Sequence, residues 1–454
     1  MSLKQTWFSL TDDLLKELKE GEELSLGLVA EDSLFLRFNS GCLRQSTAVQ
    51  QATVEMQFQS RQRKVNFNFS LTEDHFLNLN LGKELLLRAR QEVLVLAENP
   101  HCSPLKNEGS SDQDLRAHLP SEPEAIQQII EAHGSIDFAG FYSGGPVYRA
   151  SRNSAGQNHW YSTECFFYDY SLFTKSAPAA DGKIQNKAVK GNYSEKNWDR
   201  QNLLKNLKLN NELLLNLQKP SRKLPPGTYR AFLAPGAVGE IMGTLVGAFG
   251  ASQFKQGRSA FAKLANHQEK LSPLFSLTEN FNLAAAPQFN SLGEMAPREL
   301  PVVKNGVLSN WVTSSKTAKE YGLESNAAEV TGWANESLRS AEMAPGTLPT
   351  AQALEALDTG VWLGNLHYLN WSDVSSARVT GMTRYACFWV EKGQIVAPID
   401  DMRFDESIYR IFGDQLEALT LEQTLEPDIL TYWKRQLGAR KIPGALVKEF
   451  KFTL

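Results

Sequence analysis

The first seventy residues change from a helical to an alternating pattern of apolar and polar positions. Residues 9–20, SLTDDLLKELKE, begin with Ser and Thr, place acids early and lysines late, and therefore predict an amphipathic helix aligned with its dipole. Residues 24–71 alternate apolar and polar side chains around the turns AED and NSG, which predicts an antiparallel meander. The apolar run that starts near Thr72 predicts a long helix over one face of that meander.

Two polar stretches separate the elements that follow. Residues 97–121 are rich in Pro, Ser, Asn and Asp without periodicity, so we expect a surface loop. A short helix and two aromatic-rich strands come next, and the strands are joined by the turn NSAG, which begins at Asn153. A second polar loop, 175–196, precedes a predicted helix over 198–217.

The composition changes at 218–227, QKPSRKLPPG, and this stretch is the predicted domain boundary. With 454 residues, the chain is long enough for two domains or one large mixed body. We place an N-terminal domain at 1–222 and a C-terminal domain at 223–454, where glycine content rises and hairpin-like segments dominate. No fixed-period repeat is present.

The segment FLAPGAVGEIMGTLVGAFG predicts a helix over 235–249 with one apolar face. A separate row of glycines four residues apart predicts close approach of another backbone. A lone glutamate, Glu240, lies on the flank between them. Two interpretations of Glu240 stay open: a solvated or hydrogen-bonded structural residue, or a residue that lines a cavity. The glycine row consists of Gly239, Gly243 and Gly247.

Composition and charge exclude several classes of protein. Hydrophobic residues make up 42% and charged residues 22%, as in ordinary globular proteins. The formal charge of −4 is spread along the chain without a basic run, so the charge pattern does not predict direct binding of nucleic acid. The four cysteines lie far apart, no signal pattern or long apolar stretch is present, and we therefore expect a cytoplasmic protein without a membrane segment.

Two further stretches go beyond general patterning. Residues 300–322, LPVVKNGVLSNWVTSSKTAKEYG, couple a hairpin turn at Asn305 to a strand and a short helix. Residues 379–399, VTGMTRYACFWVEKGQIVAPI, hold two strands joined by EKGQ. Together with the 232–261 segment and the NSAG turn, their order and separations resemble the TldD/PmbA family, and more closely its PmbA (TldE) branch. The resemblance covers roughly residues 20–454.

The resemblance implies an α+β fold, with an N-terminal α/β module that contains an antiparallel sheet and a C-terminal domain of strongly curved antiparallel β-sheet with a few helices. It also implies dimers that enclose a cavity. The TldD branch resembles a zinc peptidase that degrades unfolded peptides and trims modified peptide precursors, with a His-Glu-x-x-x-His helix. The PmbA branch lacks those ligands and partners the active subunit. Family members are often described as modulators of DNA gyrase.

Compared with the His-Glu-x-x-x-His pattern, this chain keeps only the acid. The first His position is Gly239, the Glu is Glu240 and the second His position is Thr244. Zinc needs about four converging N, S or O ligands, three of them from protein in a catalytic site, and the seven scattered histidines form no HxxxH pair. We therefore expect no metal in this chain, no confident catalytic residue, and zinc in a TldD-like partner.

Other candidates for the lining of a cavity are turn residues and acids. Asn153 and Asn305 occupy the two turns named above. Asp400 and Asp401 open the acidic stretch PIDDMRFDES, which could form a carboxylate cluster, although a solvated acidic turn followed by a helix start is the favoured interpretation.

Two more groups of residues can be interpreted either as chemically functional or as purely structural. The aromatic residues of 138–170 could stack nucleic-acid bases, but only two arginines are interleaved, so a core or cavity lining is favoured. Cys387 could be a nucleophile, but it has no basic neighbour in sequence and is favoured as a small buried hydrophobe.

Three hypotheses of function follow. The first is a non-catalytic PmbA-like subunit that pairs with a zinc-carrying TldD-like partner and completes its cavity for a peptide substrate. The second is a homodimeric scaffold that binds a peptide or small ligand and has no peptidase activity. The third is a metal-independent hydrolase that uses Glu240 with the region of Asp400 and Asp401.

Overall fold

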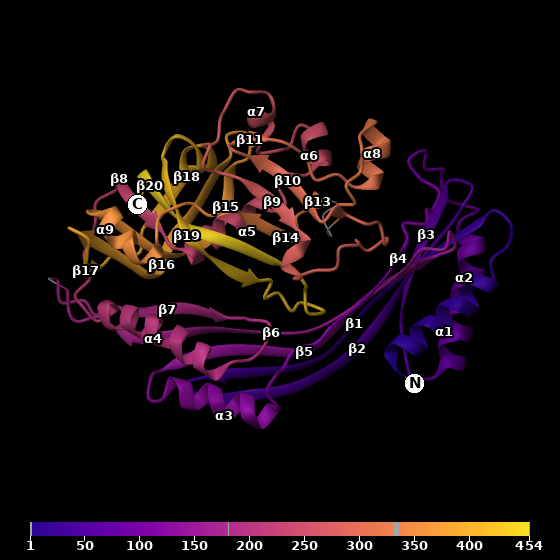
Figure 1. Ribbon diagram of the computed structural model, residues 1–454, viewed down its shortest axis with the longest axis horizontal. Coiled ribbons are helices and arrows are strands. Elements are labelled where there is room, and N and C mark those ends of the chain that lie inside the picture. Colours follow the sequence, from indigo (N-terminus) through magenta and orange to yellow (C-terminus); the bar gives the residue numbers. More distant parts are fainter. Residues whose placement is uncertain (1, 180, 331–335, 454) are drawn as a thin grey trace.

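The computed structural model describes residues 2–179, 181–330 and 336–453, and its two large β-sheets lie one above the other (Figure 1). Within these ranges seven strands form the N-terminal sheet, in the order β3-β2-β1-β5-β6-β4, with β7 also paired to β6. The pairs are antiparallel except for β4 with β6. The elements of this half are α1 (Leu3–Lys16), β1 (Glu22–Asn39), β2 (Cys42–Ser60), β3 (Arg63–Ser70), α2 (His75–Glu92), β4 (Ser110–Leu115), α3 (Glu122–His133), β5 (Phe138–Asn153), β6 (Asn158–Lys175), β7 (Asn186–Tyr193) and α4 (Arg200–Leu217).

Eleven strands of the described residues form the second sheet, which closes into a ring. Strand β8 pairs in parallel with β15 on one side and antiparallel with β20 on the other, so the path β20-β18-β16-β15-β8 returns to β20. The strands are β8 (Gly227–Leu233), β9 (Leu277–Asn280), β10 (Glu299–Lys304), β11 (Val307–Leu308), β14 (Ser340–Met343), β15 (Gly360–Asp373), β16 (Arg378–Glu391), β17 (Gln394–Pro398), β18 (Arg403–Ser407), β19 (Leu416–Pro427) and β20 (Ala439–Phe452).

Short helices and one small strand pair complete the C-terminal half. Its helices are α5 (Pro235–Leu245), α6 (Ala251–Lys255), α7 (Ala262–Ala265), α8 (Ser315–Tyr321) and α9 (Ala353–Leu357), with single turns at Phe281–Leu283, Thr350–Gln352 and Arg410–Asp414 and a two-stranded pair of β12 (Glu329–Val330) and β13 (Glu336–Ser337). The α+β class is confirmed. The ring is a mixed sheet and not a purely antiparallel one, because β8 with β15 and β14 with β20 are parallel pairs.

Alternation along β6 explains how the N-terminal sheet holds both its own helices and the other domain. Phe166, Tyr168 and Tyr170 face α3 and α4 in one hydrophobic core. Cys165 and Asp169, on the other face, point towards residues of the C-terminal half. The predicted core role of the aromatic stretch 138–170 is therefore confirmed, since most of its rings are buried.

The helices lie at the two ends of the N-terminal sheet, on the side away from the ring (Figure 1). Helices α1 and α2 cover β1, β2 and β3 through a core of their own, as predicted for the helix near Thr72. The core under α3 and α4 also includes Ala386 and Phe388 of β16. Because this core joins the two halves, the division at 222/223 stays a prediction.

Several predicted boundaries were wrong for identifiable reasons. The first helix begins at Leu3 and not near Ser9, because Ser2 and Gln5 form a capping box. The loops 97–121 and 175–196 each contain a strand, β4 and β7. Strand β4 has the sequence SSDQDL, which carries no apolar alternation, so only its pairing with β6 identifies it as a strand.

The β19–β20 loop, residues 428–438, reaches from the ring to the N-terminal sheet. Its Arg435 is buried, with 3% of the residue exposed, and donates hydrogen bonds to the carbonyls of Gly145 and Cys165. The backbone N–H of Arg435 donates to Glu31. None of the helices formed by the described residues has the length and apolar character needed to span a bilayer.

Candidate functional site on the flank of helix α5

Helix α5 begins directly after β8 and packs against strands of the ring. Pro235 occupies its first turn, and the N–H of Ala234 bonds to the carbonyl of Leu363 on β15. The residues of its predicted apolar face, among them Val238, Ile241 and Met242, are fully buried in the main hydrophobic core. The helix ends at Leu245 and not at 249. The predicted packing face is thus confirmed, and the charged flank is left for other contacts.

Glu240 faces the N-terminal sheet. Its side chain is 38% exposed, and its Oε1 lies 3.8 Å from the Nζ of Lys190 on β7. Asp169 on β6 is close enough to influence both groups. The two interpretations of Glu240, a solvated or hydrogen-bonded structural residue or one that lines a cavity, stay predictions, and its ion pair lies in a larger group of charges between the two sheets.

Burial and neighbouring charges together decide the direction in which each pKa of this group is shifted. Burial raises the pKa of Asp169, which the nearby Lys190 opposes and Glu240 reinforces, and one oxygen of Asp169 has no hydrogen-bond partner among the described residues. For Lys190, burial alone would lower the pKa, but Asp169, Glu240, Tyr385 and Glu426 together raise it. Several carboxyl groups therefore act on the charge of Lys190, although only Glu240 is within ion-pair distance of it in the described structure.

Glu426 fills the space beside the position of the first family histidine. It is the cross-strand partner of Arg440 in β19 and β20. A Cβ atom added to Gly239 would overlap the carboxylate of Glu426, and one added to Gly243 would lie 2.6 Å from an Nη of Arg440. The glycines thus make room for two charged side chains, and the predicted approach of another backbone was wrong. Gly247, the third glycine of the row, has nothing within 4 Å.

Glu426 is a carboxyl group with a strongly displaced pKa. Burial raises its pKa to about 7, and Glu240 and Asp169 add to the rise while Arg440 and Lys190 oppose it. A carboxyl that titrates near neutrality can exchange a proton at physiological pH. In this arrangement it has Arg440 as its cross-strand neighbour and the backbone of Gly239 beside its carboxylate.

The nearest imidazole does not complete a metal or nucleophile site. His367 on β15 is partly buried, and burial lowers its pKa, as does the neighbouring Arg384. Cys387 is buried, burial raises its pKa to about 11, and its Sγ donates to the carbonyls of Asn365 and Arg384. The interpretation of Cys387 as a buried small residue therefore fits the structure.

The zinc ligands that the family pattern implies are not matched by the residues present. Over 2–179, 181–330 and 336–453, no group of three His, Cys, Asp or Glu side chains could hold a metal ion. Thr244 is only partly buried on the same flank, and the place next to Gly239 is taken by a carboxylate. The residues at this helix do not fit zinc.

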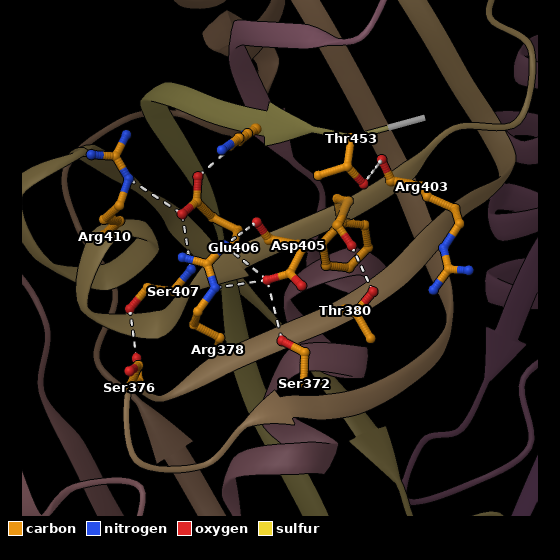
Figure 2. Close-up of polar contacts among 12 residues, drawn as sticks. Ser372, Ser376, Arg378, Thr380, Arg403, Asp405, Glu406, Ser407, Arg410 and Thr453 are labelled. Carbon is orange, nitrogen blue, oxygen red and sulfur yellow. Dashed lines mark hydrogen bonds and ion pairs between the residues drawn. The ribbon is translucent and has the colours of Figure 1, made fainter.

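The prediction for the acidic stretch after β17, a solvated acidic turn with a helix start, was wrong for its second half, which is a strand, while a helical turn does follow at Arg410–Asp414. Residues 403–407 form β18, which pairs with β16. Figure 2 shows Glu406 in contact with Arg410 and with backbone donors, and Asp405 bonded to Arg378. Only 1% of the Glu406 side chain is exposed. Paired in this way, these two acids are structural.

The remaining candidates lie apart from one another. Asp400 accepts a hydrogen bond from Gln185, and Asp401 is exposed on the same connection. Asn153 is buried in the β5–β6 turn, where its amide bonds three backbone groups. No described contact joins any of these to Glu240. Their roles in lining a cavity stay predictions.

Asn305 lies at a different place, on the rim of an open groove with a volume of about 940 Å³. The groove runs beside the β10–β11 hairpin and the α7 turn. Phe254 and Trp311 stack in its wall at 4.6 Å between ring centroids, and Leu271, Leu308 and Asn326 also line it. A groove whose lining combines stacked rings with amides and charged residues such as Glu269 and Lys270 is suited to a polypeptide or small ligand.

Sequence reasoning did not find Asp169, Lys190, Glu426 or Arg440. Each comes from a different strand, so no spacing along the chain relates them to α5. The only available signal was the pair Gly239 and Gly243, which indicated that something approaches the helix without showing that it is a charged pair.

Comparisons with known proteins agree with this arrangement. A family model described as the PmbA/TldA metallopeptidase C-terminal domain matches residues 226–454, half of the chain. The chain belongs to the PmbA/TldD metallopeptidase family. No curated protein sequence matches it.

Three solved structures share the fold of this family member over nearly its whole length. A Thermotoga maritima protein proposed to modulate a DNA gyrase has a TM-score of 0.78 at 15% identity, covering 98% of this chain and all of its own. TldE of Thermococcus kodakarensis has a TM-score of 0.80 at 13% identity, covering 99% and 100%. A Bacteroides thetaiotaomicron protein, also proposed to modulate DNA gyrase, has 0.75 at 13%, covering 99% and 98%. At these identities the likeness is one of fold.

The first prediction concerns the room left by Gly239. Gly239→Ala is expected to lower the free energy of unfolding by about 1–2 kcal/mol, because overlap with Glu426 outweighs the gain in helix propensity. Urea denaturation measures it. Gly247→Ala is the matched control and should be nearly neutral, since its Cβ meets open space. Equal stability of the two variants would contradict the crowding at Gly239.

The second prediction concerns pH. The folded-state pKa of Glu426, about 7, lies above that of an unfolded Glu, so its contribution to stability is present at low pH and is lost as the pH rises through 7. Between pH 5 and 8, wild type should therefore lose roughly 1–3 kcal/mol of unfolding free energy relative to Glu426→Gln. Denaturation of both proteins across that range, with exposed Glu84→Gln as control, tests this. A pH-independent difference would refute it.

Proposed function

We propose that this chain is a non-catalytic, TldE-like subunit that pairs with a zinc-carrying TldD-type partner and completes its cavity for unfolded or modified precursor peptides. The observation that carries the proposal is the state of helix α5: it keeps its packing face and Glu240, while the carboxylate of Glu426 fills the space where a first zinc-binding histidine would need to project from position 239.

Two physical arguments support a subunit without its own chemistry. A single acid without a metal-activated water, or a second acid placed to act with it, has little catalytic value. The acid at 240 is also engaged with Lys190, on the sheet that packs against the ring. This contact adds a charged link to the junction of the two halves, which buried contacts such as Phe388 with the core under α3 and α4 also hold together.

The third prediction tests the subunit proposal by metal analysis and peptide cleavage. The isolated chain should hold far less than one zinc per chain and should not cleave unstructured peptides. A mixture with a TldD-type partner should cleave them, lose activity with a chelator and regain it with zinc. Stoichiometric zinc together with cleavage by the isolated chain would contradict the proposal.

A second candidate function is favoured by a specific observation, the groove of about 940 Å³ beside the β10–β11 hairpin. Its stacked Phe254 and Trp311 offer apolar contact area, and Asn305 lies on the lining, whereas the amides of Asn310 and Asn326 are already bonded to the chain's own backbone. Under this second hypothesis the chain is a homodimeric scaffold that binds peptide and has no peptidase partner. If the organism that produces this chain encodes no protein with an intact His-Glu-x-x-x-His helix, the second hypothesis is favoured.

The fourth prediction tests the groove. Trp311→Ala should weaken binding of a fluorescent unstructured peptide by at least tenfold, on the order of 1.4 kcal/mol, because it removes one wall of the stacked pair. Fluorescence anisotropy measures it, and Phe76→Ala, at an exposed aromatic on α2, is the control. If both variants bind as wild type does, the groove is not the binding site.

A further inference from the structure

Strands β2 and β3 carry a strip of polar side chains on one face of the N-terminal sheet. Alternate residues of β2, such as Met56, point into the core under α1 and α2. Because side chains alternate along a strand, the residues between them point to the other face, on the side of the ring (Figure 1). We call these side chains the polar strip, and they are Gln51, Thr53, Glu55 and Gln57 on β2 and Asn66, Asn68 and Ser70 on β3.

The polar strip consists of amides and hydroxyls except for one carboxylate, Glu55. The strand register places Glu55 opposite Asn68, and Gln57 opposite Asn66. Both asparagines are exposed, and in the part of the chain that the structure describes no hydrogen bond occupies their amides or that of Gln57. Each amide offers two N–H donors and one carbonyl acceptor. The strip therefore presents free donors and acceptors side by side with little charge.

An aromatic pair lies at one end of the polar strip. The carbonyl of Trp433, in the β19–β20 loop, accepts a 2.7 Å hydrogen bond from Gln51. Trp433 is 94% exposed and Tyr432 is 80% exposed. The φ of Trp433 is +68°, which is unusual for a bulky residue, and buried Arg435 anchors the base of the loop. The loop thus presents two aromatic side chains from a fixed base beside the strip.

The chemistry of this surface decides which class of ligand it fits. A nucleic acid needs cations along its path, but the polar strip holds a carboxylate, and Lys64 lies beyond its last pair. A polypeptide needs pockets for apolar side chains or an unpaired strand edge. Strand β2 is paired with β1 and β3 over residues 53–60, and the side chains of the strip are polar. The surface therefore favours neither class.

A neutral oligosaccharide fits both the aromatic pair and the polar strip. A glucose ring has C–H groups on its faces and hydroxyls around its edge. Its faces stack on aromatic rings, and Trp and Tyr supply large contact areas for such stacking. Its hydroxyls both donate and accept, as side-chain amides do. The strip extends for about 20 Å from Gln51 to Gln57, which is enough for several sugar rings in a row.

From these observations we propose that the polar strip and the Trp433 loop form a binding site for a neutral oligosaccharide of glucose configuration. One sugar ring stacks on Trp433 or Tyr432, and the hydroxyls of the following rings bond to the amides of the strip and to Glu55. The site goes beyond the function proposed above, because it involves neither helix α5 nor the groove beside the β10–β11 hairpin.

The fifth prediction is tested by isothermal titration calorimetry of the isolated, full-length protein with cellohexaose, a chain of β-linked glucose. Wild type should bind with a dissociation constant on the order of 0.1–10 mM, because an exposed surface leaves much of the ligand in water. Trp433→Ala should weaken binding roughly tenfold, because it removes the stacking surface. The double variant Asn66→Ala, Asn68→Ala should weaken it roughly threefold or more, because two free amides are lost.

Controls separate binding from folding. Tyr368→Ala on β15 is the matched control, since Tyr368 is also an exposed aromatic residue at positive φ, and it should bind cellohexaose as wild type does. Each replaced side chain is exposed, so every variant should keep the wild-type circular dichroism and thermal midpoint. In saturation-transfer NMR the carbon-bound protons of the sugar should receive saturation from wild type and lose it with Trp433→Ala.

Three results would overturn the proposal. The first is a wild type that binds none of cellohexaose, maltohexaose and chitohexaose at tens of millimolar, whereas binding of any one of them supports the site. The second is binding that Trp433→Ala leaves unchanged. The third is displacement of the sugar by an uncharged, unstructured peptide, which would assign the surface to polypeptides. Zinc content and peptide cleavage are measured separately, so failure of either proposal leaves the other standing.

Discussion

The double pairing of β8 is the constraint on which the rest of the structure depends. Because β8 binds β15 on one side and β20 on the other, a sheet that would otherwise have two open edges closes into a ring. Helix α5 follows β8 after one residue and is therefore fixed against the ring with its apolar face inward. That placement leaves Glu240 with one direction to face, the N-terminal sheet.

The charged group at this junction is more than a set of independent pairs. Lys190 lies 3.8 Å from Glu240 and acts on Asp169 and Glu426 through its charge, and Arg440 acts on Glu426 in the same way, so a change at one of these residues shifts the pKa of the others. Glycine at 239 and 243 is part of the same arrangement, because the charged side chains occupy the volume that larger residues would need. The helix of a metallopeptidase family is here a support for an interface between two sheets.

Local patterns predicted the elements that bury one face. The α5 stripe, the meander from residue 24 and the helix near Thr72 all follow from periodicity. The predictions failed for elements that depend on a neighbouring strand. Strands β4 and β18 are polar, and they form because they pair with β6 and β16. The parallel pairs of the ring and the convergence of Lys190 and Glu426 near α5 also depend on residues far apart in the sequence. Periodicity within a short stretch of the chain therefore could not predict them.

The β19–β20 loop has a consequence for how the protein is made. Its Arg435 supplies buried hydrogen bonds to Gly145 and Cys165, about 290 and 270 positions earlier in the chain. During synthesis at about 5–20 residues per second, that face of the N-terminal sheet waits on the order of 10–60 s before its partner leaves the ribosome. Through that interval the face of the sheet that carries these two acceptors lacks the cover that the finished protein gives it. The early sheet therefore needs transient protection during synthesis, a need that is absent from the finished molecule.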